Sequence, residues 1–166
     1  MTSALLLAFL LLAPAGSGAA PRPLRIVQVS DTHIGRHPPG EDAERLRTFL
    51  RQLVAQESPV DVWAFTGDLT HGALDGQFER FREALDVLPA EARVLLVRGN
   101  HDEERPPQDP GELFARVLGE AVTRVDLGGW RLVTAPMLTP DGAEGARLME
   151  ILRESELPTL LFVHYY

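Results

Sequence analysis

The amino-acid sequence predicts an α/β fold in which a largely parallel sheet packs against a second sheet. In the first part of the chain, short apolar runs alternate with longer amphipathic segments, a pattern typical of right-handed strand–helix–strand units. Further along, two apolar runs flank Gly128-Gly129, a strong signal for an antiparallel hairpin. Together the two patterns predict parallel and antiparallel pairing in one domain.

The first part of the chain is expected to hold three strands and two helices. Short apolar runs bounded by turn residues predict the strands: residues 24–29, 62–65 and 93–97. Apolar side chains at helical spacing predict the helices: residues 41–56 and 76–88. Pro59 follows the first helix and Pro89 the second, and both are residues that end helices.

The second part of the chain is expected to begin with an exposed loop over residues 103–110, which are charged and rich in proline. The helices predicted after it are residues 111–118 and 143–153. The strands predicted here are residues 122–127, 130–135 and 159–163. The last of these strands leads directly into His164.

The N-terminal residues resemble a secretory signal peptide. Ala4 to Ala13 is an unbroken apolar stretch, and the small residues that follow suit a cleavage site after Ala19. A membrane-spanning helix needs about 20 apolar residues, so this stretch favours export over a stable membrane span. We therefore expect a signal peptide over residues 1–19, a mature domain over residues 20–166, and a periplasmic or extracellular location.

Composition narrows the classes of partner and chemistry. The 166-residue chain has a net charge of −8, which argues against nucleic acid as a partner because such binding needs a basic face. The chain has no cysteine, so disulfides and thiolate metal ligands are excluded. Oligomeric state has no signature in the sequence.

Three polar clusters follow the three predicted strands of the first part of the chain. They are Asp31-Thr32-His33, Gly67-Asp68 and Gly99-Asn100-His101-Asp102. Ligands of open α/β sheets bind beyond the carboxyl ends of the strands, so these clusters should meet at one rim. Carboxylate, amide and imidazole groups converging there indicate a site for divalent metal ions.

Two-metal hydrolytic sites hold the attacking and leaving oxygens of a phosphoryl displacement. The residue types suggest a role for each side chain at a site of this kind. Asp68, on a tight turn, is expected to bridge the ions, because a carboxylate has two oxygens and a charge that lowers their repulsion. Asp31 and His33 lie two apart in a segment that we expect to be extended, which would direct both toward the first ion. Asn100 and His164 are expected to bind the second ion.

The same clusters predict the catalytic groups. His101 would donate a proton to the leaving alkoxide or hold a phosphate oxygen. Asp102 would accept the other imidazole N–H of His101 and fix its tautomer. A metal-bound hydroxide would be the nucleophile, and no serine or cysteine nucleophile is required. His71 could equally be a residue of the substrate rim or a solvated loop histidine.

Taken together, these motifs resemble those of the calcineurin-like metallophosphoesterase superfamily. Within it, residues 30–33, 66–70 and 98–102 are similar to the motifs of bacterial cyclic-nucleotide and glycerophosphodiester phosphodiesterases. The resemblance implies a four-layer α/β/β/α sandwich, two divalent transition-metal ions (Mn, Fe, Co or Zn) and a small phosphorylated substrate. It also implies the ligand roles given above for Asp31, His33, Asp68, Asn100 and His164.

The chain departs from the family pattern at its C-terminal end. That pattern closes with a Gly-His-x-His element, whereas the sequence stops at Tyr166, so we expect an incomplete sandwich and a chain truncated at its C-terminus. The main hypothesis is a phosphohydrolase that cleaves phosphodiester or phosphomonoester bonds. The alternative is a non-catalytic or weakly active remnant of the same fold. A calcium-stabilised module is disfavoured, because calcium prefers all-oxygen ligands.

Overall fold

The computed structural model describes residues 21–56, 59–103, 111–136, 142–154 and 156–164, in which two three-stranded sheets form. The first sheet is wholly parallel, and its strands lie side by side in chain order: β1 (Ile26–Val29), β2 (Val62–Thr66) and β3 (Val94–Val97). The second sheet pairs its first two strands antiparallel and its last two parallel: β4 (Arg124–Leu127), β5 (Trp130–Ala135) and β6 (Thr159–Val163). The expected mixture of pairings is confirmed.

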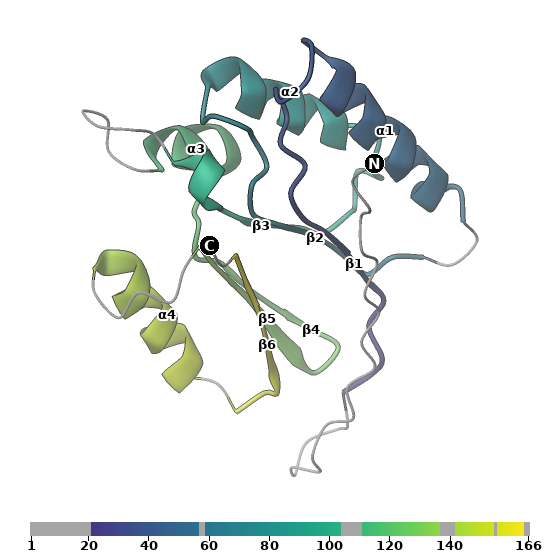
Figure 1. Cartoon of the computed structure of the whole chain (residues 1–166). Helices are drawn as coiled ribbons and strands as arrows, with labels where there is room; N and C mark the ends of the chain where they lie inside the picture. The colour runs from purple at the N-terminus through teal and green to yellow at the C-terminus, as the bar shows by residue number, and fades with distance from the viewer. Residues whose placement is uncertain (1–20, 57–58, 104–110, 137–141, 155, 165–166) are drawn as a thin grey trace.

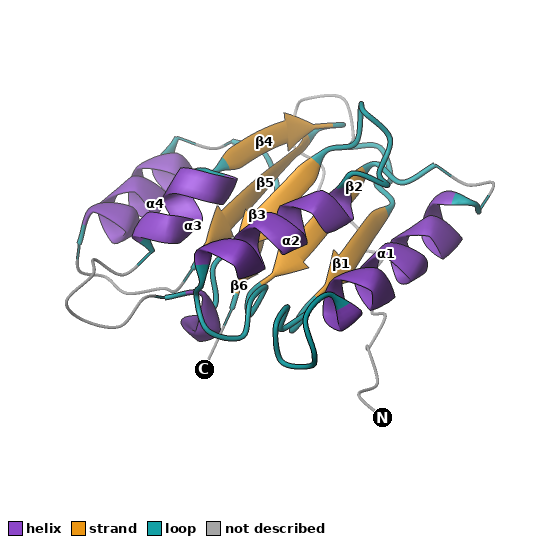
Figure 2. Ribbon diagram, turned by 90° about the horizontal axis from the view of Figure 1, so that it is seen from above, coloured by secondary structure: helices purple, strands orange, loops and turns teal. Residues whose placement is uncertain are grey.

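Helices cover the outer face of each sheet, which gives four layers (Figure 1). The helices on the first sheet are α1 (Glu41–Val54), α2 (Asp75–Leu85) and α3 (Glu112–Leu118). One further helix, α4 (Ala143–Arg153), packs on the second sheet. Figure 2 shows α1 and α2 lying over the first sheet, with α4 at the left of the view. The α/β/β/α sandwich that the family resemblance implies is confirmed.

The alternation of side chains along β2 explains how one sheet serves two layers. Trp63 and Phe65 point to the helices and are 2% and 0% exposed. Val62 and Ala64 point to the opposite face and pack with Leu132 of β5 between the sheets. Every residue of β2 is buried, as expected for a central strand with neighbours on both faces.

The second sheet has its own apolar contact with α4. Val133 and Ala135 of β5 pack against Leu148 and Ile151 of the helix, and all four are buried. Every residue of β5 is buried, because one face of the strand packs against the first sheet and the other against α4.

Several predicted elements differ at their ends for identifiable reasons. The helix predicted to reach residue 88 ends at Leu85, because the N–H groups of Asp86 and Leu88 bond to carbonyls three residues back in tighter turns. The strand predicted from residue 122 begins at Arg124, since the N–H of Thr123 donates to the Thr134 hydroxyl.

Two predictions fall largely or wholly on residues that are not described. The signal peptide over residues 1–19 lies outside the described residues, as does most of the loop over 103–110. Within the described part of the chain, every helix is too short or too polar to cross a lipid bilayer.

The contact between the two sheets should be sensitive to the loss of a single apolar side chain. Leu132 is 0% exposed between the sheets, so Leu132→Ala should lower the free energy of unfolding by about 2–5 kcal/mol. Leu74→Ala is the matched control, because Leu74 is 61% exposed and should change stability by less than about 0.5 kcal/mol. Urea unfolding measures both, and equal effects would contradict the proposed packing.

Candidate metal centre

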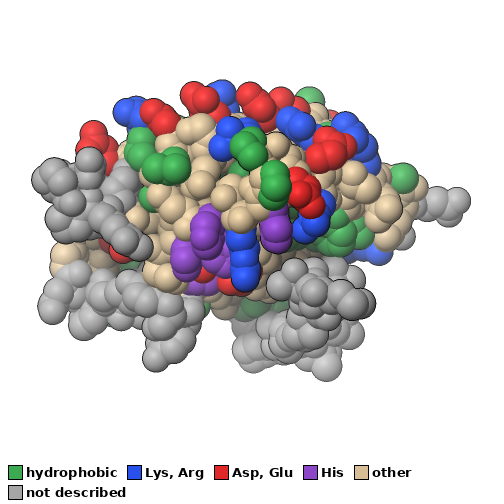
Figure 3. Space-filling model, turned by 45° about the horizontal axis from the view of Figure 1, so that its top comes forward, with side chains coloured by type: hydrophobic (Ala, Val, Ile, Leu, Met, Phe, Trp, Pro, Cys, Tyr) green, Lys and Arg blue, Asp and Glu red, His purple; other side chains and the backbone are tan. Residues whose placement is uncertain are grey.

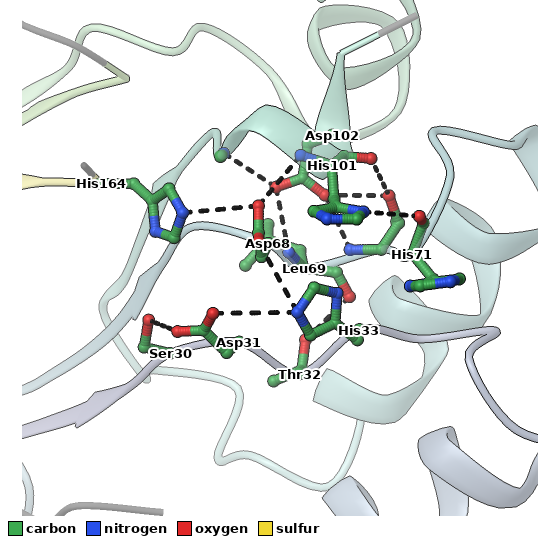
Figure 4. A network of polar contacts seen from close by, with 12 residues as sticks. Ser30, Asp31, Thr32, His33, Asp68, Leu69, His71, His101, Asp102 and His164 are labelled. Carbon is green, nitrogen blue, oxygen red and sulfur yellow. Dashed lines mark hydrogen bonds and ion pairs between the residues drawn. The ribbon is translucent and has the colours of Figure 1, made fainter. Parts of the chain in front are cut away.

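The predicted site residues meet at one rim of the molecule (Figure 4). Each follows the end of a strand: Asp31 after β1, Asp68 after β2, and Asn100 and His101 after β3. His164 follows β6, so the second sheet also contributes a side chain. Four of them border a cavity of about 420 Å³, which is lined by Gln28, Ser30, Asp31, Thr66, Asp68, Asn100, Val163 and His164.

Three of these residues have a left-handed backbone, which corrects the expectation of an extended segment. The φ angles are 59° at Asp31, 44° at His33 and 51° at Asp68. The N–H of Asp31 donates to the carbonyl of Gly67, and the N–H of His33 donates to that of Asp68. These bonds hold the β1 loop against the β2 loop, and they offset a conformational cost of about 1–2 kcal/mol per residue.

The buried carboxylate of Asp68 faces a different histidine with each of its oxygens. Its Oδ2 lies 3.6 Å from Nε2 of His33, and its Oδ1 lies 3.4 Å from Nε2 of His164. Oδ1 also accepts the backbone N–H of His101 at 3.0 Å. These contacts fix the carboxylate between the two histidines.

In its neutral form, His164 presents the lone pair of Nε2 to this carboxylate. Its Nδ1 lies 3.1 Å from the carbonyl oxygen of Thr66, and because a carbonyl only accepts, Nδ1 carries the proton of the neutral ring. The lone pair of Nε2 then faces Asp68 Oδ1, an arrangement of two acceptors that calls for a cation. A second bond that fixes the tautomer in this way is typical of metal-ligating histidines.

Asp31 and His33 complete the other side of the site. Oδ1 of Asp31 lies 3.8 Å from Nε2 of His33, while its Oδ2 accepts the hydroxyl of Ser30. Burial lowers the pKa of His33, an effect that the nearby carboxylate of Asp68 partly opposes. A lowered pKa favours the neutral imidazole, which is the form that binds metal ions.

Glycine at position 99 allows the β3 loop to approach Asp68. A Cβ atom at Gly99 would lie 2.2 Å from the backbone nitrogen of Asp68 and 2.4 Å from its Oδ1. The φ of −103° at Gly99 suits any residue, so steric contact alone requires glycine here. This approach brings Asn100 to the cavity wall beside Asp68.

Asp102 has a different role from the one predicted for it. Its buried carboxylate accepts backbone N–H groups of Leu69, Thr70 and Gly99, together with the hydroxyl of Thr70. Burial raises the pKa of Asp102, although these hydrogen bonds oppose the rise. The expected bond to His101 is therefore wrong: the carboxylate joins the loop after β2 to the loop after β3.

The His101 imidazole instead bonds to the backbone of His71. Nδ1 of His101 lies 2.8 Å from the carbonyl oxygen of His71, and the two rings stack with centroids 5.3 Å apart and planes 16° apart. The sequence left the role of His71 open, and the structure brings it to the site. The only signal for it was its position three residues after Asp68.

A family model now gives the comparison that decides the family. The model for the calcineurin-like phosphoesterases matches residues 24–159. The chain belongs to the calcineurin-like phosphoesterase family. This confirms the family resemblance drawn from the three motifs, and membership of the family supports a metal-dependent phosphoesterase.

The chain was also compared with curated proteins and with solved structures. No curated protein matches it. Among solved structures it is similar to the crystal structure of Pseudomonas putida nuclease MPE, with 22% sequence identity and a TM-score of 0.40. The match covers 82% of this chain and 60% of the nuclease chain, so the chain spans less than two thirds of that protein.

Removing the charge of Asp102 should destabilise the loops that carry the site. In Asp102→Asn an amide NH₂ replaces one acceptor oxygen and faces backbone donors, so unfolding free energy should fall by about 2–4 kcal/mol. Urea unfolding measures the change. Asp75→Asn, at the exposed start of α2, is the control. It removes only a surface ion pair with Arg116, so the free energy of unfolding should fall by less than about 1 kcal/mol. Equal stability of the two variants would contradict the role given to Asp102.

Proposed function

We propose that the protein is a metal-dependent phosphoesterase that hydrolyses phosphodiester or phosphomonoester bonds at a dinuclear site. The position of Asp68 is the observation that carries this proposal. Its two oxygens face His33 and His164 at 3.6 and 3.4 Å, as a carboxylate shared between two ions would. Family membership supports the reaction class.

The donor set fits two divalent transition-metal ions. Asp31, His33 and Asp68 would hold the first ion, while Asp68, Asn100 and His164 would hold the second. In support, Asp31, Asp68 and His164 each have a ligand atom within 4.8 Å of the others, and Asn100 lines the same cavity. Mixed oxygen and imidazole donors suit Mn, Fe, Co or Zn.

Bound ions at such sites withdraw charge from phosphoryl oxygens and lower the pKa of water. The side chains around them would orient the substrate and move protons. His101 is the group placed to act on the leaving oxygen: its Nδ1–H is held by the His71 carbonyl, so its Nε2 is left to exchange a proton. Asp102 acts as a positioning residue, because it holds the loop on which His101 lies.

The substrate we propose is a small phosphorylated compound and not a nucleic acid. The net charge of −8 would repel a long polyanion, whereas a small phosphate ester meets only the local field of the site. The stick view in Figure 4 shows that the site residues come from several separate loops, and we propose that such loops also set the specificity.

Loss of the charge at position 68 should remove metal binding and turnover together. We expect Asp68→Asn to lower Mn²⁺ affinity, and the hydrolysis of a chromogenic phosphodiester with added Mn²⁺, by at least about 100-fold, since even outer partners of metal ligands matter by roughly 10–100-fold. Asp86→Asn, at an exposed position after α2, is the control and should leave both unchanged. Electron paramagnetic resonance measures free Mn²⁺, and an unchanged affinity in Asp68→Asn would overturn the proposal.

We also propose that the protein is exported, on the basis of the apolar stretch over residues 4–13. N-terminal sequencing of the protein recovered outside the cytoplasm should then begin at Ala20. Recovery of a chain that still begins at Met1 would contradict cleavage at this position.

A further inference from the structure

Three of the five histidines in the sequence form a cluster beside the carboxylate site. His33, His71 and His101 each have a ring nitrogen within 4.8 Å of the others. The rings of His33 and His101 meet edge to face at 4.8 Å, and those of His33 and His71 at 5.5 Å. Figure 3 shows histidine side chains gathered on one face of the molecule.

The hydrogen bonds of His101 leave one of its nitrogens free to bind a metal ion. Its Nδ1 donates to the carbonyl of His71, so the neutral ring has a lone pair on Nε2. A histidine whose far nitrogen is held by a backbone carbonyl is the usual form of a metal ligand. The bond also fixes the orientation of the ring.

His33 can serve both groups of side chains as an imidazolate. A neutral ring has one lone pair, so a second ion on Nδ1 would displace the Nδ1 proton to solvent. Nε2 faces Asp31 and Asp68 at 3.8 and 3.6 Å. Nδ1 is buried and has no hydrogen-bond partner among the described residues, a costly condition unless something binds it. Figure 4 shows the ring between the two carboxylates on one side and His71 on the other.

The position of His71 is set by its backbone, which leaves its ring available. Its N–H donates to the carbonyl of Ile34, and the next residue, Gly72, donates to the side chain of Gln77. The residue itself is exposed. The His71 ring therefore lies at the entrance to the cluster, where an ion would arrive from solvent.

We propose that His33, His71 and His101 form a three-imidazole site that binds Zn²⁺, beside the carboxylate-rich pair of ions and sharing His33 with it. Three imidazoles with a fourth position open are a known zinc coordination, and the open position would take water or an anion such as phosphate. Imidazole also favours zinc over manganese, which prefers oxygen donors. The site goes beyond the proposed function: an ion on Nε2 of His101 would occupy the nitrogen that the proposed reaction uses to exchange a proton, so zinc bound here would lower turnover.

If this site exists, His71→Ala should lose zinc binding and His37→Ala should keep it. Titration of the whole chain with Zn²⁺, in the presence of saturating Mn²⁺, is followed by isothermal calorimetry. His71→Ala should weaken one zinc-binding step by more than about 100-fold, because loss of a direct ligand exceeds the roughly 10–100-fold effect of an outer partner. Mn²⁺ binding should be unchanged in this variant.

His37→Ala is the matched control. His37 is also a histidine of a rim loop, but its ring is bonded to Asp42 and lies outside the cluster. This variant should bind Zn²⁺ as the unmodified chain does. Equal zinc binding by His71→Ala and the unmodified chain would overturn the proposal, and so would equal losses in the two variants.

A spectroscopic measurement keeps the test independent of small changes in stability. Co²⁺ in place of Zn²⁺ should give an intense visible absorption band, typical of four-coordinate Co²⁺ with imidazole ligands. The band should be absent in His71→Ala and present in His37→Ala. Absence of this band from the unmodified chain would count against the site. This outcome is distinct from that for Asp68→Asn. The dinuclear proposal fails if Mn²⁺ affinity is unchanged in Asp68→Asn. The three-imidazole proposal fails if Zn²⁺ affinity is unchanged in His71→Ala.

Discussion

The arrangement of the site depends on one buried carboxylate. Asp102 is 0% exposed and accepts donors from Leu69, Thr70 and Gly99, which lie on two different loops. A buried charge is stable only when its oxygens are satisfied, so the two loops are held at the one separation that satisfies them. Asp68 directly precedes Leu69 in the first loop. Asn100 and His101 lie between Gly99 and Asp102 in the second loop. Their mutual distances follow from this constraint.

A second layer of constraint comes from left-handed backbone at the site. Asp31, His33 and Asp68 adopt positive φ angles that isolated residues of these types rarely take. Backbone hydrogen bonds between the β1 and β2 loops stabilise these angles, so the side chains are oriented before any ligand arrives. Such preorganisation reduces the cost of ordering ligands when an ion binds.

The sequence predicts the architecture because hydrophobic periodicity reports directly on burial. The apolar run over residues 62–65 and the Phe residues of α2 lie in the core where their spacing places them, and α4 has the predicted bounds. The convergence of Asp31 and Asp68 was also predictable, since they follow neighbouring parallel strands of one sheet. His164 follows β6 of the second sheet, so sheet topology alone does not predict that it joins them.

Loop conformation and backbone hydrogen bonding were not predictable in this way. The role of Asp102 depends on three main-chain N–H groups, and main-chain donors are the same for every residue type and so leave no pattern in the sequence. Asp42 is a similar case: its place in the first turn of α1 suggests only a favourable charge, yet its carboxylate also accepts the N–H groups of Gly35 and His37. The place of His71 likewise follows from a loop held by its backbone.

The contact at Gly67 links the two halves of the sandwich. A Cβ atom there would lie 2.1 Å from the ring of His164, so the end of β6 rests directly on the turn that follows β2. Any ligand held jointly by Asp68 and His164 would therefore cross the boundary between the layers. Its binding energy would add to the free energy that keeps the layers docked, and conditions that loosen the docking would weaken binding by the same amount.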